Sequence, residues 1–273
     1  MKEIPKFICL LGLPRSGTTV TTAIIDAHPA VEMFYEPWNS SRKNPPPIYK
    51  NPLQFQIEMR KKLGTKPNPE TEVVGFKETS EHQESLEWSK LILKQMEKHC
   101  ECLLLFLVRD PIHAYLSKVE GARKYWNHPN AQVTEEGYKD YTRKVINAYR
   151  YIGEIANDYK TIIFDYDAIV ESPENILPKI MEFIGLQYEE SQLNYYEKKW
   201  QKNKIMGDPE VGKNPKKIST ASMIKRKEEA EEFRKTFKLD YWEKPEIQAL
   251  ESYCQKIKSE KVTRENIFLP ILF

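Results

Sequence analysis

The sequence predicts an α/β fold in which a central parallel β-sheet is covered by helices on both faces. Continuous apolar runs of strand length alternate with longer segments of helical period, and the runs are residues 7–11, 73–76, 102–108 and 161–164. Strands without a polar face are buried on both sides, as in parallel sheets between two helical layers. No repeat or linker divides the chain, so we expect a single domain, 1–273.

The predicted helices follow directly from the spacing of apolar residues and from capping signals. Residues 20–27 carry apolar side chains at i, i+3, i+4 and i+7, which predicts a helix immediately after the first strand. Asp110 and Pro111 are typical of an N-cap and a first helical position. Further helices are predicted over 141–155 and from Ser172 onward. The prolines within 39–49 predict a loop.

Composition excludes several classes of protein. The chain has 42 Lys and Arg residues against 40 Asp and Glu, a net charge of +2, which does not favour a nucleic-acid partner. Four cysteines without a metal or disulfide pattern indicate free thiols in a reducing compartment. We see no signal peptide and no membrane-length apolar run, and the apolar tail 267–273 is too short to span. A cytoplasmic protein without a transmembrane segment is expected.

The sharpest signal is a loop rich in glycines and hydroxyls between the first predicted strand and the first predicted helix, residues 12–19, GLPRSGTT. A loop at a helix start directs backbone N–H groups and the positive end of the helix dipole toward one point. Glycines let an anion approach the backbone, and hydroxyls add donors. The loop therefore predicts binding of a phosphate-like group.

This loop differs from the nucleotide-binding P-loop, G-x-x-x-x-G-K-[ST], at an informative position. Thr18 stands where that motif has its lysine, and a basic residue comes three positions earlier, as Arg15. Without that lysine the loop is poorly suited to act on a γ-phosphate with magnesium. An ATP-dependent kinase of the P-loop class is the nearest alternative function, and the missing lysine speaks against it.

The segment P-R-S-G-T-T, within 13–29, resembles the phosphosulfate loop of sulfotransferases that use 3′-phosphoadenosine 5′-phosphosulfate (PAPS). It is most similar to the tyrosylprotein, carbohydrate and bacterial branches; the cytosolic branch has lysine in place of Arg15. The resemblance implies a P-loop-like sulfotransferase fold. It also implies that the 5′-phosphosulfate is bound by Pro14, Arg15, Ser16, Gly17, Thr18 and Thr19.

A second motif resembles the 3′-phosphate element of the same family. Residues 107–111, L-V-R-D-P, are followed by Ser117. Arg109 ends a predicted strand, where its guanidinium can clamp a phosphate bidentately, and the Ser117 hydroxyl can add a donor. An arginine at a strand end is equally often an ion-pair partner. Together, however, the two motifs imply a ligand with anionic groups at separate places, as in PAPS and its product PAP (3′-phosphoadenosine 5′-phosphate).

In-line sulfuryl transfer needs a proton acceptor for the attacking hydroxyl and positive charge at the leaving phosphate. By resemblance, Glu36 in F-Y-E-P-W is the expected base, Lys77 in G-F-K-E-T stabilises the transferred group, and Arg15 assists. No metal is required, and no ligand cluster is visible. An exposed loop glutamate is the alternative interpretation of Glu36.

Three other residues are alternatives to Glu36 as the base. Glu78 and His82 lie close to Lys77 along the chain, and His28 lies in a D-A-H-P turn that resembles a helix end in the family. Thr79 stands where the cytosolic branch has a histidine, so that role is not transferred.

The late region 198–227 carries ten basic residues against two acidic ones, which is typical of a solvated surface. Relatives close a late loop over the 3′-phosphate, so Lys213, Lys216 or Lys217 can contribute to donor binding, and Trp200 can stack on adenine. The R-K-G-x-x-G-D-W-K form of the cytosolic branch is absent.

The resemblance covers about residues 6–184. Within it, 163–167 and 173–186 resemble the strand and helix that follow the family's 3′-phosphate element, and we expect them to have a structural role because their residues are typical of a core. Segments 39–69 and 124–136 are expected to shape the acceptor pocket. The sequence does not distinguish small-molecule, carbohydrate, lipid and peptide acceptors. A non-catalytic nucleotide-binding protein of the same fold is a further alternative.

Overall fold

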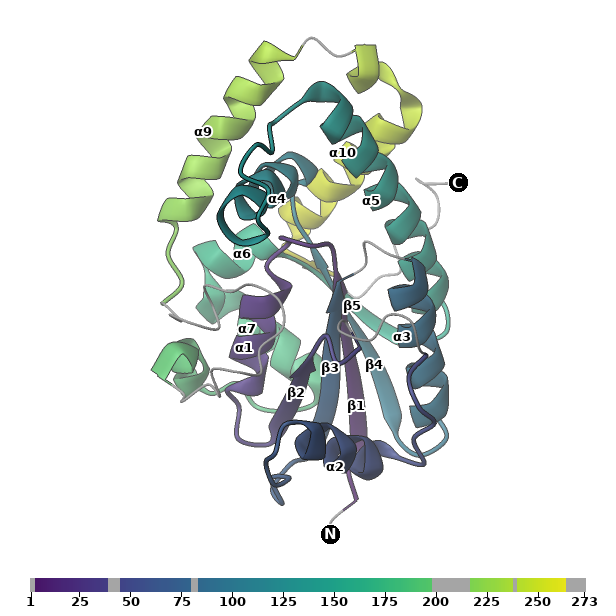
Figure 1. Ribbon diagram of the computed structural model, residues 1–273. Coiled ribbons are helices and arrows are strands. Elements are labelled where there is room, and N and C mark those ends of the chain that lie inside the picture. The colour runs from purple at the N-terminus through teal and green to yellow at the C-terminus, as the bar shows by residue number, and fades with distance from the viewer. Residues whose placement is uncertain (1–2, 39–44, 80–82, 198–216, 238–239, 264–273) are drawn as a thin grey trace.

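The computed structural model describes residues 3–38, 45–79, 83–197, 217–237 and 240–263, and within them it contains one six-stranded sheet (Figure 1). The strand order is β2-β3-β1-β4-β5-β6. The first five strands are parallel, and β6 pairs antiparallel with β5. The bounds are β1 Lys6–Gly12, β2 Val31–Tyr35, β3 Val73–Thr79, β4 Glu101–Val108, β5 Lys160–Asp165 and β6 Val262–Thr263.

Helices cover both faces of this sheet, which confirms the predicted fold class. One face packs against α1 Thr18–Asp26, α6 Tyr166–Glu171 and α7 Pro173–Ile184. The core of the other face is completed by α2 Pro52–Lys62, α3 Gln83–Met96, α4 Pro111–Tyr125, α5 Glu135–Ala156, α9 Ala221–Thr236 and α10 Pro245–Glu260. Short 3-10 helices are η2 Glu190–Glu197 and η3 Asp240–Glu243.

The predicted helices are present, with one difference in capping. The Asp110 side chain accepts hydrogen bonds from the Ile112 and His113 amides at 2.8 and 3.2 Å, and Pro111 is the first residue of α4. Helix α5 begins at Glu135, six residues before its apolar period, because Thr134 caps it. Helix α7 begins at Pro173, but the Ser172 side chain makes no capping hydrogen bond.

Two strands were missed in the sequence. Strand β2 contains Glu32, a charge that a buried strand does not ordinarily carry, and β6 has two residues only. Strand β3 also continues three residues beyond its predicted end, to Thr79, because Lys77 and Glu78 are buried in it. In β2 and β3 the charged side chains of Glu32 and Lys77 have partners that neighbouring sequence does not reveal.

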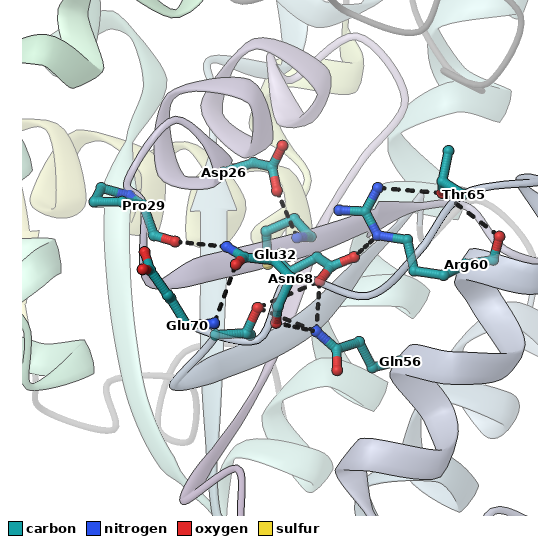
Figure 2. Close-up of polar contacts among 10 residues, drawn as sticks. Asp26, Pro29, Glu32, Gln56, Arg60, Thr65, Asn68 and Glu70 are labelled. Carbon is teal, nitrogen blue, oxygen red and sulfur yellow. Dashed lines mark hydrogen bonds and ion pairs between the residues drawn. The ribbon is translucent and has the colours of Figure 1, made fainter. Parts of the chain in front are cut away.

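Glu32 is buried and holds α2 to the sheet (Figure 2). Its carboxylate accepts a hydrogen bond from Gln56 Nε2 at 2.6 Å and pairs with Arg60, and both partners lie on α2. Thr71 adds a hydroxyl at 3.4 Å. Phe55 of α2 packs in the core of the same face. Helix α2 thus lies where the strands begin (Figure 1), so this part of segment 39–69 packs on the core.

Candidate active site

The carboxyl ends of the central strands bring both anion-binding motifs to one edge of the sheet. Gly12, at the end of β1, pairs with Leu107 of β4 on one side and with Thr79 of β3 on the other. Val108 pairs with Asp165 at the end of β5. Ligands of open α/β sheets bind at this edge. The loop after β1, the end of β3 and Arg109 after β4 therefore converge in space.

The loop between β1 and α1 has the backbone of an anion-binding turn. Arg15 and Gly17 both have positive φ, 68° and 93°, and the Ser16 hydroxyl donates to the Leu13 carbonyl at 2.6 Å. The amide of Thr21 donates to the Gly17 carbonyl, so the preceding amides of α1 have no acceptor within the helix. The helix dipole and these amides favour an anion at this end of α1.

Arg15 and Arg109 lie in direct contact although 94 residues separate them. Arg109 Nη1 donates to the Arg15 carbonyl at 2.8 Å, and Arg15 Nε donates to Ser117 Oγ on α4 at 3.2 Å. Arg109 and Ser117 are both buried. The geometry thus unites the two predicted elements, with the second motif supporting the backbone of the first.

Glu36 and Lys77 form a buried ion pair beside the loop. Lys77 has no exposed surface and Glu36 is 4% exposed; Lys77 Nζ contacts the Glu36 carboxylate and lies 3.3 Å from Thr19 Oγ1. The Glu36 amide donates to the Lys77 carbonyl at 2.9 Å while its backbone has a φ of 42°. A non-glycine residue in this left-handed region is uncommon and occurs often at functional sites. Glu36 is therefore not an exposed loop residue.

Arg109 has two further neighbours that the sequence did not single out. Its guanidinium lies 4.7 Å from the ring centroid of Tyr166, and its Nε lies 3.7 Å from the Asp167 carboxylate. Asp167 also contacts His113 Nδ1 at 3.2 Å. Burial opposes ionisation of Asp167, but His113 and Arg109 hold its pKa below the usual range. The available signal was a polar D-Y-D segment at a strand end, where sites of this fold lie. Ile163 and Phe164 are core, as expected, but the structural role expected for all of 163–167 did not foresee the contacts of Tyr166 and Asp167 with Arg109.

The pKa of Asp165 predicts how the stability of the protein depends on pH. Burial, then repulsion from Asp167, raises the pKa of Asp165 to about 7, above its unfolded value near 3.9. A raised folded pKa favours the neutral acid, so stability is lost as the pH rises toward 7 and the carboxyl ionises. Asp165→Asn keeps an acceptor for the Ala168 amide, which Asp165 caps at 2.9 Å. Its stability advantage over wild type should grow by about 3 kcal/mol between pH 5 and pH 8.

Urea unfolding of the wild-type protein and of Asp165→Asn at both pH values measures this change. Asp140→Asn is the matched control, since the half-exposed carboxylate of Asp140 pairs with Arg143 and Lys144 at the surface of α5. An advantage of Asp165→Asn that is the same at both pH values would contradict the raised pKa.

Arg226 on α9 is a further basic residue near this edge. It contacts Glu120 of α4 and Glu229 of its own helix. Burial lowers the pKa of Arg226, the pairing with Glu229 opposes this, and the charges of Arg109 and Arg15 lower it further. Arg226 could not be singled out from the sequence, because it stands within a run of basic residues. Arg226 therefore lies close enough to Arg15 and Arg109 for their charges to act on it, while two carboxylates balance its own charge.

His28 lies at the opposite edge of the sheet from the loop. It follows α1 and precedes β2, whose first residue Val31 pairs with the first residue of β3. The His28 ring accepts a hydrogen bond from the Ala30 amide at 3.1 Å, and its other nitrogen lies 3.8 Å from the Glu189 carboxylate. These contacts give His28 a place in a turn, away from Arg15.

The side chains of Glu78 and Lys77 lie on opposite faces of the sheet. Consecutive strand residues point to opposite faces, and Lys77 faces α1 through Thr19. The Glu78 carboxylate lies near Cys9. Burial, followed by the negative charge of Glu78, raises the pKa of the Cys9 thiol. Cys9 belongs to the core on the face covered by α3.

Four predicted site residues lie outside the described residues: the alternative base His82 and the possible donor contacts Trp200, Lys213 and Lys216. Lys217, just before α9, is exposed. The four cysteines are free, as expected. Across the described ranges, no helix has both the length and the apolar character needed to cross a bilayer.

Comparison with known proteins agrees with this geometry. The sulfotransferase domain family matches residues 5–261. Solved structures share the fold, among them two sulfotransferase domains. The sulfotransferase domain of the Synechococcus PCC 7002 olefin synthase has a TM-score of 0.54 and 17% identity, over 83% of this chain and 89% of that one. The sulfotransferase domain of the curacin biosynthetic pathway has a TM-score of 0.53 and 16% identity, and the match covers 95% of this chain and 98% of that one.

No curated protein sequence matches the chain. The family match covers nearly the whole chain, and it agrees with the sheet, the loop and the arginine that meet at its carboxyl edge. The protein belongs to the sulfotransferase family and is an enzyme of that class.

Proposed function

We propose that this enzyme transfers the sulfuryl group of PAPS to an acceptor hydroxyl or similar group at the carboxyl edge of the sheet. The observation that carries the proposal is the contact between the two anion-binding elements, from Arg109 to the Arg15 carbonyl and from Arg15 to Ser117. A ligand spanning both elements needs two anionic groups. PAPS has a phosphosulfate at its 5′ end and a phosphate at its 3′ position.

The residues present fit such a donor. The amides of Ser16 to Thr19, together with Arg15, suit the 5′-phosphosulfate, because helix-start amides and a guanidinium bind tetrahedral anions. Arg109 and Ser117 suit the 3′-phosphate, and Lys213 and Lys217 are proposed to contribute from the late segment. Bound PAPS supplies an activated sulfuryl group with a phosphate as its leaving group.

Glu36 and Lys77 are proposed to divide the chemistry. Glu36 accepts the proton of the attacking hydroxyl, which then bonds to sulfur as the bond from sulfur to the leaving phosphate oxygen breaks. Lys77 is held beside Thr19 at the loop, where its charge neutralises that oxygen. Because Arg15, Lys77 and Arg109 supply positive charge, we propose transfer without a metal ion.

Arg109→Ala tests the assignment of the two phosphates. The variant should bind PAP at least tenfold more weakly, because a lost charge-assisted contact costs about 1.5–3 kcal/mol. The affinity for adenosine 5′-phosphosulfate, which lacks the 3′-phosphate, should fall much less. Calorimetric titration measures both affinities.

Arg143→Ala is the matched control for this experiment, because Arg143 is an exposed arginine on α5 with a surface ion pair. It should leave both affinities unchanged. An equal loss of both ligands in Arg109→Ala would show that Arg109 supports the fold instead of reading the 3′-phosphate.

A further inference from the structure

Tyr166 touches both anion-binding elements from a third part of the chain. It is the first residue of α6, directly after β5. A Cβ at Gly17 would lie 2.1 Å from the Tyr166 ring, so the ring packs directly against the phosphosulfate loop. The Arg109 guanidinium lies over the same ring, 4.7 Å from its centroid. One half-buried aromatic side chain thus contacts the loop and the arginine.

The remaining neighbours of Arg109 hold parts of its guanidinium but do not fix the plane of the group. Nη1 is held by the Arg15 carbonyl at 2.8 Å, and Nε faces the Asp167 carboxylate at 3.7 Å. Asp167 is fixed in turn by His113 at 3.2 Å. Nε has no hydrogen-bond partner among the described residues, so neither contact by itself clamps the guanidinium plane. The face of the Tyr166 ring supplies that constraint.

We propose that Tyr166 is a positioning residue that fixes the Arg109 guanidinium against the phosphosulfate loop and thereby sets the preference for a donor with a 3′-phosphate. This role rests on the proposed function. An arginine side chain samples many rotamers, and stacking on an aromatic ring limits them through cation–π attraction. The constraint depends on the ring and not on the phenol hydroxyl. Gly17 is needed for this arrangement, because any side chain there would occupy the position of the Tyr166 ring.

The readout is the ratio of the PAP and adenosine 5′-phosphosulfate affinities, measured by calorimetry. Tyr166→Leu keeps apolar bulk and removes the π face, and it should lower this ratio about tenfold. Tyr166→Phe should keep the wild-type ratio, whatever the hydroxyl contributes to both ligands equally. Tyr151→Leu, a half-buried tyrosine on α5, is the control and should leave the ratio unchanged. Tyr166→Met serves if the leucine variant does not fold.

A double-mutant cycle separates positioning from general support of the fold. In the Arg109→Ala background, Tyr166→Leu should cause no further change in the ratio, because the group that it positions is gone. An unchanged ratio in folded Tyr166→Leu, or the same fall with Arg109 absent, would overturn the positioning role while leaving PAPS as the donor. A wild-type protein that does not prefer PAP over adenosine 5′-phosphosulfate would instead overturn the proposed function, and this role with it.

Discussion

Glu36→Gln should lower turnover about 10²- to 10⁴-fold and leave PAP affinity nearly unchanged. Glutamine has the size of glutamate and can still accept a hydrogen bond from Lys77, but it cannot take the proton of the acceptor hydroxyl. The expected defect is therefore confined to the chemical step. Calorimetry with PAP can be done first, and turnover can follow once an acceptor screen has identified a substrate.

The outcomes of this experiment are distinct. Full turnover in Glu36→Gln would contradict its role as base and pass it to His82 or Glu78. For Glu78 that result would also require acceptor access from the α3 face of the sheet, where its carboxylate acts on Cys9. Loss of PAP binding, or of the fold, would make Glu36 a structural residue. Glu78→Gln is the matched control and should retain turnover.

Lys77→Met should abolish most turnover, weaken PAPS binding and destabilise the fold. Lys77 has no exposed surface, so its removal leaves the Glu36 carboxylate buried without its ion-pair partner. Removing one member of a buried pair typically costs about 3–5 kcal/mol. Methionine approximates the length of the lysine stem and thus limits the loss of packing. Urea unfolding measures the stability change, and calorimetry measures the binding.

The double variant Lys77→Met/Glu36→Gln separates the electrostatic cost from the chemical role. It should recover much of the stability lost in Lys77→Met, because no charge is then left buried alone, and it should remain inactive. If both single variants and the double variant lost the same stability, packing and not charge pairing would explain the effect. Retention of turnover in Lys77→Met would contradict its proposed role at the leaving phosphate.

Local sequence was sufficient where one short segment specifies both an element and its chemistry. The apolar run before Gly12 and the apolar period after Thr18 predicted a strand and a helix, and hence a turn that presents amides. Arg109 was predicted in the same way, from its place at the end of an apolar run and before Asp110 and Pro111. Parallel strands then bring these ends together without any long-range information.

The remaining features depend on contacts between segments far apart in the chain. Glu32 made β2 unlike a buried strand until Gln56 and Arg60 were seen to satisfy its carboxylate. Tyr166 resembles an ordinary residue at a strand end, and only the packing of α6 against Gly17 gives it a place in the site. Arg226 could not be predicted for a related reason. It is one of ten basic residues in 198–227, and nothing in the neighbouring sequence distinguishes it from the others.

The central claim is that this edge of the sheet binds a nucleotide with phosphates at two positions and needs no metal to do so. Thermal unfolding with PAP in the presence of a chelator, compared with ATP and magnesium, tests it most directly. A ligand at a hundred times its Kd stabilises the folded state by about 2.7 kcal/mol, which a melting curve resolves readily. PAP should raise the melting temperature without a divalent metal and by more than ATP with magnesium. Greater stabilisation by ATP with magnesium would contradict the account.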